Sequence, residues 1–263
     1  MDPSRRQSAA RYVRQMTYGR FGIDGQRRLA GGRALIVGVG GLGCTAADLL
    51  ARAGVGAIRL VDDDTVSVEN LHRQVLFDEQ DAAAALAKVD AAAGRLKRIN
   101  ADVRVEAVRD RLTPANAAEL AEGVDVILDG TDSFPTRFVL NDLSIQRRIP
   151  WVFAGVVGAE AQIMTVVPGR TRCLRCVFDS PPPPCVDPTC RTAGVLGPAV
   201  AAVAAMQAME AIKILSGHPE RVRGDLVKFD LWTGELQRID VSAACADVPC
   251  PCCQGGRFDF LGG

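Results

Sequence analysis

A glycine-rich turn near the start of the chain restricts the folds open to it. Residues 38–43 read Gly-Val-Gly-Gly-Leu-Gly; they follow the apolar run 34–37 and precede apolar residues at helical spacing over 44–53. Gly54 is placed to end that helix, and residues 57–62 supply a second strand. Strand, glycine turn, helix and strand form a βαβ unit, whose crossover is right-handed. The chain is therefore predicted to adopt a Rossmann-like α/β fold.

Strand and helix patterns continue to alternate after this unit. Helices are expected over residues 86–99 and after Pro114, and strands over 103–108 and 124–129. This order predicts a doubly wound, mainly parallel sheet. Strand-like runs at 151–156 and 162–167 have no helix between them, which predicts antiparallel additions in the C-terminal half. An apolar helix and strands near 226–229 and 236–241 then precede a cysteine-rich tail.

Composition excludes several classes of protein. Basic and acidic residues are equal at 31 each, so general nucleic-acid binding is not expected. The N-terminus lacks the apolar segment of a signal peptide, which predicts a cytoplasmic protein. The longest apolar stretch, 195–215, carries Gln207, Glu210 and Lys213 at three-residue steps. We interpret these as a polar stripe on a helix of a soluble protein, with no membrane span.

The glycine turn predicts a nucleotide site. Gly38, Gly40, Gly41 and Gly43 match the pattern that brings backbone N–H groups to a phosphate at a helix N-terminus. Asp62 follows at the end of the next strand, where a carboxylate binds ribose. This pattern alone does not separate NAD from ATP.

The polar segment 62–74 favours ATP, because hydride transfer needs an apolar slot for nicotinamide. Arg73 and Lys88 can bind a triphosphate. Asp132 follows a predicted strand, and a carboxylate at that edge suits magnesium bridged to phosphates. Taken singly, the two cations could be solvated surface charges and Asp132 a helix N-cap.

Nine cysteines in a reducing compartment point to metal binding or thiol chemistry. Two Cys-x-x-Cys pairs have the spacing of a structural zinc site: Cys173, Cys176, Cys250 and Cys253. Redox-active cysteines are the alternative. The neighbouring Cys252 leaves the fourth ligand open, and Cys44, inside the first helix, is expected to be packed and inert.

Together these motifs resemble the MoeB/ThiF/HesA family, bacterial relatives of ubiquitin-activating enzymes, and the MoeB branch in particular. The resemblance runs from about Arg11 to Cys253 and includes segments 11–15, 37–43, 62–66, 70–74 and 131–132 and the cysteine pairs. It implies one adenylation domain over 1–253, with an arm at 1–30, a nucleotide-binding half at 31–150 and a carrier-binding and zinc half at 151–253. A tail follows at 254–263.

The implied activity is adenylation of the C-terminal glycine carboxylate of a ubiquitin-like sulfur-carrier protein ending in Gly-Gly, with ATP and Mg²⁺ as substrate and cofactor and Zn²⁺ as structural metal. Residue by residue, the resemblance assigns Gly41 to the phosphate loop and Asp132 to magnesium. It assigns these residues to the nucleotide: Asp62, Asp64, Asn70, Arg73, Gln74 and Lys88. Arg14 would reach into a partner subunit's site, which implies a homodimer.

Some features of the chain depart from the family or stay open. Cys190 aligns with a crossover-loop cysteine that is covalent in some relatives and dispensable in the MoeB branch. Ser133 replaces the usual Asn, and the proline-rich segment near 180–184 is longer, which leaves the carrier's identity open. No rhodanese-like domain follows Cys253, so a separate sulfur donor, a rhodanese or a cysteine desulfurase, is expected.

Rival interpretations keep the fold and change the activity. The acceptor could be a peptide or a tRNA base, or the chain could be a non-catalytic half of a heterodimer; an NAD-dependent dehydrogenase is disfavoured by segment 62–74. Cys185 has no assigned role, and the Leu-Gly-Gly ending at 261–263 resembles a carrier tail.

Overall fold

The computed structural model describes residues 10–182, 193–222 and 224–262. A single eight-stranded sheet forms its centre, in the order β3-β2-β1-β4-β5-β6-β7-β8. The strands are β1 (Arg33–Val37), β2 (Ala57–Val61), β3 (Arg104–Val108), β4 (Val126–Asp129), β5 (Trp151–Val157), β6 (Glu160–Val166), β7 (Leu226–Asp230) and β8 (Glu235–Ile239). Strands β1 to β5 pair in parallel and β6 to β8 are antiparallel. The predicted α/β class with antiparallel additions is confirmed.

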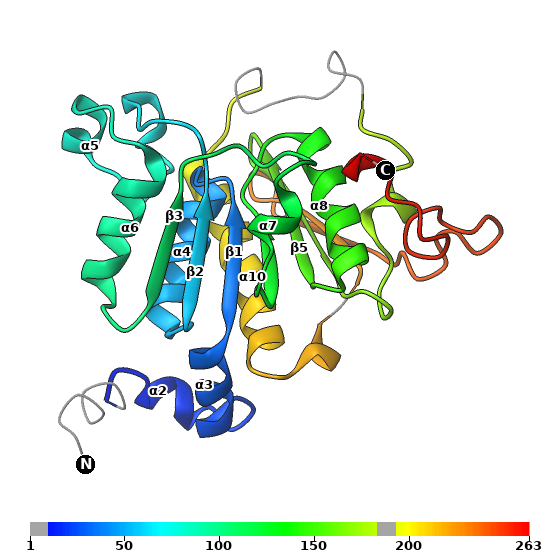
Figure 1. Cartoon of the computed structure of the whole chain (residues 1–263), viewed down its shortest axis with the longest axis horizontal. Coiled ribbons are helices and arrows are strands. Elements are labelled where there is room, and N and C mark those ends of the chain that lie inside the picture. The colour runs from blue at the N-terminus through cyan, green and yellow to red at the C-terminus, as the bar shows by residue number, and fades with distance from the viewer. Residues whose placement is uncertain (1–9, 183–192, 223, 263) are drawn as a thin grey trace.

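Helices cover both faces of this sheet (Figure 1). One face packs against α4 (Gly41–Ala53), α6 (Lys88–Ile99) and α10 (Gly197–Leu215). The other packs against α7 (Ala117–Leu120), α8 (Phe134–Arg147) and the cysteine-rich tail. The remaining helices are α2 (Val13–Thr17), α3 (Gly22–Gly31), α5 (Glu79–Ala83), η1 (Val68–Asn70), η2 (Leu174–Cys176), η3 (Pro219–Arg221) and η4 (Asp259–Leu261).

The first βαβ unit forms as its glycines predict. Gly54 adopts φ +84° and ends α4, because this left-handed conformation costs glycine little. Cys44 is fully buried in α4, and burial raises the pKa of its thiol. A thiol in that state is a poor nucleophile, so the expectation of a packed, inert cysteine is confirmed.

Helix α10 differs from the expected polar stripe. Gln207 is fully buried, and its Nε2 donates to the carbonyl oxygens of Asp129 and Val152, each at 2.8 Å. Glu210 and Lys213 pair with each other. The exposed face of α10 is instead apolar, with Met206 and Met209 exposed by 37% and 53%. The polar residue lies inside because two strand-end carbonyls need a donor there.

Helix α10 is also the one helix, among the residues described, that is long and apolar enough to cross a membrane. It packs against α4 and against strands β4, β5 and β6. Its buried apolar residues, such as Val200 and Val203, therefore belong to the core between the helix and the sheet.

The N-terminal arm lies at the amino edge of the parallel strands, opposite the edge at which the glycine turn lies (Figure 1). The Tyr12 ring packs against Gly54, and the Tyr12 hydroxyl accepts a 2.7 Å hydrogen bond from Asn100 Nδ2. Gln15 Nε2 donates to the carbonyl of Ala53. These contacts hold α2 against the C-terminal ends of α4 and α6.

Candidate active site and metal centre

The nucleotide-site candidates gather at the carboxyl edge of the sheet, where β1, β2 and β4 end. The backbone N–H of Val39, in the glycine loop, donates to Asp62 Oδ2 at 2.6 Å. Gly38 has φ +88°, and a Cβ there would lie 2.7 Å from the Gly130 carbonyl. This close approach brings the loop after β4, which carries Asp132, against the glycine loop. The edge of a parallel sheet where strand order reverses is a common ligand site.

The loop has the features that a nucleotide requires. Within the described residues no side chain caps the N-terminus of α4, so its first N–H groups remain available to a phosphate. The Gln74 side chain is buried, with 3% of the residue exposed, and its Oε1 has no hydrogen-bond partner in the part of the chain that the structure describes. The Gln74 amide lies beside Gly40. A buried amide oxygen without a partner fits a site that a ligand completes.

Arg73 is held against the start of α4. Its Nη2 donates to Asn70 Oδ1 at 2.8 Å, and its side chain lies beside Gly41. Arg73 Nη1 also donates to the carbonyl of Glu69, so these contacts fix the guanidinium while the stem of the side chain lies against the glycine loop. This geometry brings together two of the residues assigned to the nucleotide by sequence.

Lys88 begins α6 and is paired with Asp64. Its Nζ lies 2.7 Å from Asp64 Oδ2, and its side chain is only 6% exposed. The role of Asp64 in this structure is thus to bind a lysine. One of the three ammonium donors is used, which leaves donors for a phosphate.

Asp132 is exposed in the loop between β4 and α8. Ser133, not Asp132, is the N-cap of α8, because its Oγ accepts from the N–H of Thr136. The carboxylate of Asp132 is therefore not used as a cap, and serine is a normal residue for that cap.

Sequence reasoning missed a buried ion pair behind this loop. Arg137 Nε lies 2.9 Å from Asp129 Oδ2, and both side chains are nearly inaccessible. Arg137 Nη2 donates to the carbonyls of Thr131 and Ala154. Burial raises the pKa of Asp129, and Arg137 opposes that shift. Arg137 follows Asp129 by eight residues. Helix α8 begins only at Phe134, so helical spacing does not predict that the two side chains pair.

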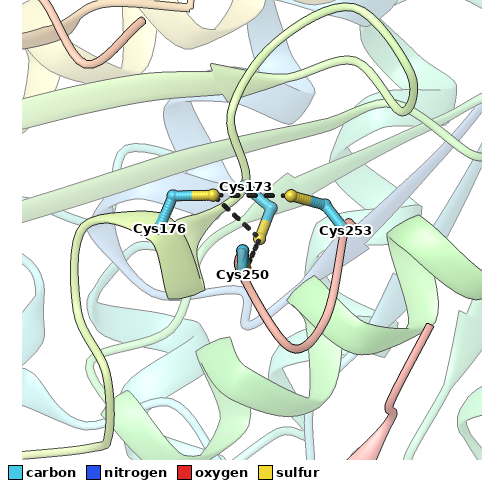
Figure 2. A group of neighbouring side chains, drawn as sticks. All are labelled: Cys173, Cys176, Cys250 and Cys253. Carbon is cyan, nitrogen blue, oxygen red and sulfur yellow. Dashed lines mark hydrogen bonds between the residues drawn. The ribbon is translucent and has the colours of Figure 1, made fainter. Parts of the chain in front are cut away.

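The four predicted cysteine ligands come together (Figure 2). Their sulfur atoms all lie within 4.8 Å of one another. Three separations are 3.9 Å for Cys173–Cys176, 3.7 Å for Cys173–Cys250 and 3.4 Å for Cys176–Cys253. Tetrahedral zinc with Zn–S bonds of about 2.3 Å needs sulfurs about 3.8 Å apart. The four thiols therefore fit a zinc ion.

The group of four sulfurs that lie close together includes Cys253 and leaves out Cys252. Cys252 is buried, and its Sγ accepts from Asn141 Nδ2 at 3.4 Å, outside the group of four. Hydrogen bonds from neighbouring thiols, Cys176 first, lower the pKa of Cys173. Contact with Cys173 in turn raises the pKa of Cys176. These opposite shifts arise because the two thiols lie within hydrogen-bonding distance of each other.

Helix α8 supports the cysteine cluster from behind. Asn141 Oδ1 accepts from the N–H of Leu174, between two cysteines of the group. Asp142 is fully buried and pairs with Arg175, which also binds Asp259 in the tail at 2.8 Å. Phe260 packs against Phe138 in a tilted arrangement, with ring centroids 4.8 Å apart. Hydrogen bonds of this kind around a metal site orient its ligands.

One predicted residue, Arg14, is not brought to the nucleotide edge of its own chain. Arg14 is exposed on α2, at the opposite edge of the sheet. Cys185, Cys190 and the last two residues of the proline-rich segment, 183–184, lie outside the described residues.

Comparison with known proteins identifies the family. The sequence model described as "ThiF family" matches residues 12–252. The chain belongs to the ThiF family. The resemblance expected from the sequence motifs is confirmed, because the match covers the glycine loop, the polar segment and three of the four paired cysteines.

Several ThiF family relatives are named for the adenylation of sulfur carriers. The chain is 39% identical to the sulfur carrier protein ThiS adenylyltransferase of Bacillus subtilis, over 95% of this chain and 73% of that one. It is 37% identical to the sulfur carrier protein adenylyltransferase of Thermus thermophilus, over 92% and 90%. It is 42% identical to the adenylyltransferase and sulfurtransferase MOCS3 of Sus scrofa, of which it spans 53%.

Solved structures show the same fold. Escherichia coli MccB with ATP superposes with a TM-score of 0.80 at 22% identity, over 92% of this chain and 74% of that chain. PaaA superposes with a TM-score of 0.73, also at 22% identity, over 89% and 74%.

Proposed function

We propose that this ThiF family protein is an adenylyltransferase that activates the C-terminal glycine carboxylate of a ubiquitin-like sulfur-carrier protein ending in Gly-Gly. One observation carries the proposal: Arg73 and the loop that carries Asp132 lie against the glycine loop before the uncapped N-terminus of α4, and Lys88 is paired with Asp64, just after β2 at the same edge of the sheet. Relatives that are 37–39% identical and bear the name of sulfur-carrier adenylyltransferases support the choice of acceptor.

The reaction is a substitution at phosphorus. A carboxylate oxygen of the carrier attacks the α-phosphorus of ATP, a new O–P bond forms, and the bond to the β-phosphate oxygen breaks. The products are an acyl-adenylate and pyrophosphate. Attack brings like charges together, so cations and correct positioning supply most of the catalysis.

The residues present suit those tasks. Asp62 would accept from the ribose with the lone pairs that Val39 and Asp64 leave free. Arg73 and Lys88 would bind the phosphates. Asp132 offers the exposed carboxylate that magnesium prefers, and the metal would neutralise phosphate charge.

Arg14 completes this site only from a second copy of the chain. Helix α4 has 13 residues and is therefore about 20 Å long, and it separates the arm from the glycine loop of the same chain. The exposed apolar face of α10, with Met206 and Met209, offers a surface that a partner subunit would cover. We therefore propose a homodimer with composite sites.

Zinc has a structural role in this proposal. All four ligand positions are thiolates, so no position stays open for a substrate. The site ties the tail at 250–253 to the sheet. Sulfur transfer after adenylation would need a separate donor, a rhodanese or a cysteine desulfurase. We expect that adenylation does not need Cys190. We place the enzyme in the cytoplasm.

Pyrophosphate release tests the proposal. The purified protein, with ATP and Mg²⁺, is challenged with a panel of carriers ending in Gly-Gly and with each carrier lacking its last glycine. Stimulation by one intact carrier alone is the expected result and names the partner. Pyrophosphate release that depends on a peptide or a tRNA would instead establish a different acceptor. A protein that binds ATP but releases no pyrophosphate with any acceptor would favour a non-catalytic subunit.

A further inference from the structure

On the face of the sheet that α8 covers, the side chains change from apolar to polar toward the carboxyl end of β5. Paired residues on neighbouring strands project from the same face. One row on this face is apolar and buried, and it runs Phe153, Met164, Leu226, Ile239 from β5 to β8. The next row toward the carboxyl end of β5 is polar, and it runs Gly155, Gln162, Lys228, Gln237.

The polar row begins with a gap in the side-chain layer. Gly155 has no side chain, and a Cβ there would lie 3.3 Å from Gln162 Nε2 and 3.4 Å from Arg137 Nη2. Arg137 and Gln162 therefore face each other across the glycine. The slot between them lies beside the loop that carries Asp132, since Arg137 also binds the carbonyl of Thr131 at 2.8 Å.

Both walls of this slot have unused hydrogen-bonding groups. Arg137 is 5% exposed and uses Nε and Nη2 for Asp129, Thr131 and Ala154, but its Nη1 has no partner among the described residues. A guanidinium has five donors, so two stay free on Nη1. Within the described part of the chain, the half-buried Gln162 amide has no side-chain partner either. The free donors of Arg137 suit a carboxylate. The neighbouring Gln162 amide suits the peptide group that precedes such a carboxylate at the end of a chain.

We infer that this slot receives the terminal glycine of the acyl substrate. Arg137 Nη1 binds the carboxylate that attacks ATP, and the Gln162 amide binds the last peptide group above Gly155. Glycine is selected because the two walls leave no room for a substrate Cβ. The row continues for three strand spacings, about 14 Å, which matches about four residues of extended tail. The inference deepens the proposed function and rests on it.

Two variants test the slot while keeping both residues of the buried ion pair, Arg137 and Asp129. Gln162→Ala removes the amide wall, and Gly155→Ala fills the gap with a methyl group. Each should raise the KM for the activating carrier about tenfold, the loss of one hydrogen bond to a substrate, while the KM for ATP stays unchanged. Gln162→Glu, nearly isosteric, should be worse than Gln162→Ala because it sets a carboxylate beside the substrate's own. Gln146→Ala, on an exposed turn of α8, is the matched control and should leave both KM values unchanged.

The outcomes separate this inference from the proposed function. Wild-type protein that releases no pyrophosphate with any Gly-Gly carrier contradicts the proposed function itself. If the wild-type protein is active and the slot variants keep its KM for the carrier, the inference about the slot is wrong and the proposed function stands. A rise in the KM for ATP instead assigns Arg137 and Gln162 to the nucleotide and also overturns the inference about the slot. A carrier ending in Gly-Ala should be rejected by wild type and accepted better by Gln162→Ala, a result that a merely structural role for Gln162 does not produce.

Discussion

Lys88 Nζ lies 2.7 Å from Asp64 Oδ2, with the lysine side chain 6% exposed and the aspartate 63% exposed. The backbone N–H of Lys88 also donates to the Asp64 carbonyl. Asp64 therefore supplies the negative charge that stabilises a buried ammonium group while the nucleotide site is empty. A bound phosphate can supply the same charge, which links this pair to ATP.

Replacement of Asp64 by Asn should destabilise the protein only when ATP is absent. We expect the free energy of unfolding to fall by about 1 kcal/mol, a modest loss because Asp64 is largely solvated. Saturating ATP should remove most of the difference, since its phosphates replace the lost carboxylate. Urea unfolding with and without ATP measures both values. An equal loss in both conditions would show that Lys88 does not reach the nucleotide.

Asp132→Ala should abolish pyrophosphate release while ATP binding and the fold persist. Loss of a group that stabilises charge in the transition state costs about 10²–10³ in rate. Ser133→Ala is the matched control, because it removes the α8 cap and should cost about 1 kcal/mol of stability with activity retained. Pyrophosphate release and urea unfolding are measured on both. Activity retained in Asp132→Ala contradicts the magnesium role.

Cys250→Ser should remove zinc and destabilise the protein severely, because structural zinc sites contribute on the order of 10 kcal/mol. Cys252→Ser is the matched control, because Cys252 lies between the two ligands, two positions after Cys250 and one before Cys253, and it should keep one zinc per chain. The zinc content of each purified protein, measured by mass spectrometry, tests this prediction. Zinc lost from Cys252→Ser and kept in Cys253→Ser would assign the fourth ligand to Cys252.

Arg14→Ala and Asp132→Ala should each be inactive alone and should complement each other when mixed. In a hybrid dimer, the chain that keeps Asp132 receives Arg14 from its partner, so one of two sites is complete. Unfolding and refolding the mixture allows the chains to exchange, and about half of the dimers formed from equal amounts are hybrids. Recovery of pyrophosphate release is expected. Mixed chains that stay inactive would place Arg14 in its own subunit's chemistry or in none.

Asp78 makes one contribution to stability depend on pH. The backbone N–H of Asp81 donates to this N-cap carboxylate, and Gln80 and Arg95 also bind it, so its pKa is lowered. A carboxyl whose pKa is lower in the folded state stabilises the protein above its unfolded pKa of about 3.9, and that contribution is lost as pH falls through the folded value. Asp78→Asn keeps the capping oxygen and removes the charge. The difference in unfolding free energy between the two proteins should be constant near neutral pH and shrink in acid; a difference that grows in acid contradicts this sign.

The sequence predicted those parts of the fold that depend on local pattern. The glycine turn, Gly54 and the alternating strands set the parallel half of the sheet, and the spacing of Cys173 and Cys176 predicted half of a metal site. These signals lie within a few residues of each other. They could be interpreted without knowing the tertiary structure.

Tertiary partners could not be predicted in this way. Gln207 belonged to an expected polar stripe, yet it is buried because the ends of β4 and β5 present carbonyls to it. The pairing of Arg137 with Asp129 could not be predicted either, since nothing local in the sequence indicates that the two side chains are buried together. The choice between Cys252 and Cys253 likewise depends on Asn141, which lies 111 residues earlier than Cys252 in sequence.

The contact between Cys173 and Cys250 joins positions 77 residues apart. Everything between them, including α10 and the hairpin of β7 and β8, lies in a loop whose two ends are fastened to each other and to α8. A single peptide-bond cut inside that loop would therefore leave two fragments still joined as one particle. Nicked protein should migrate as an intact molecule in native gels and separate into pieces only when the thiols are stripped of metal and the chain is denatured.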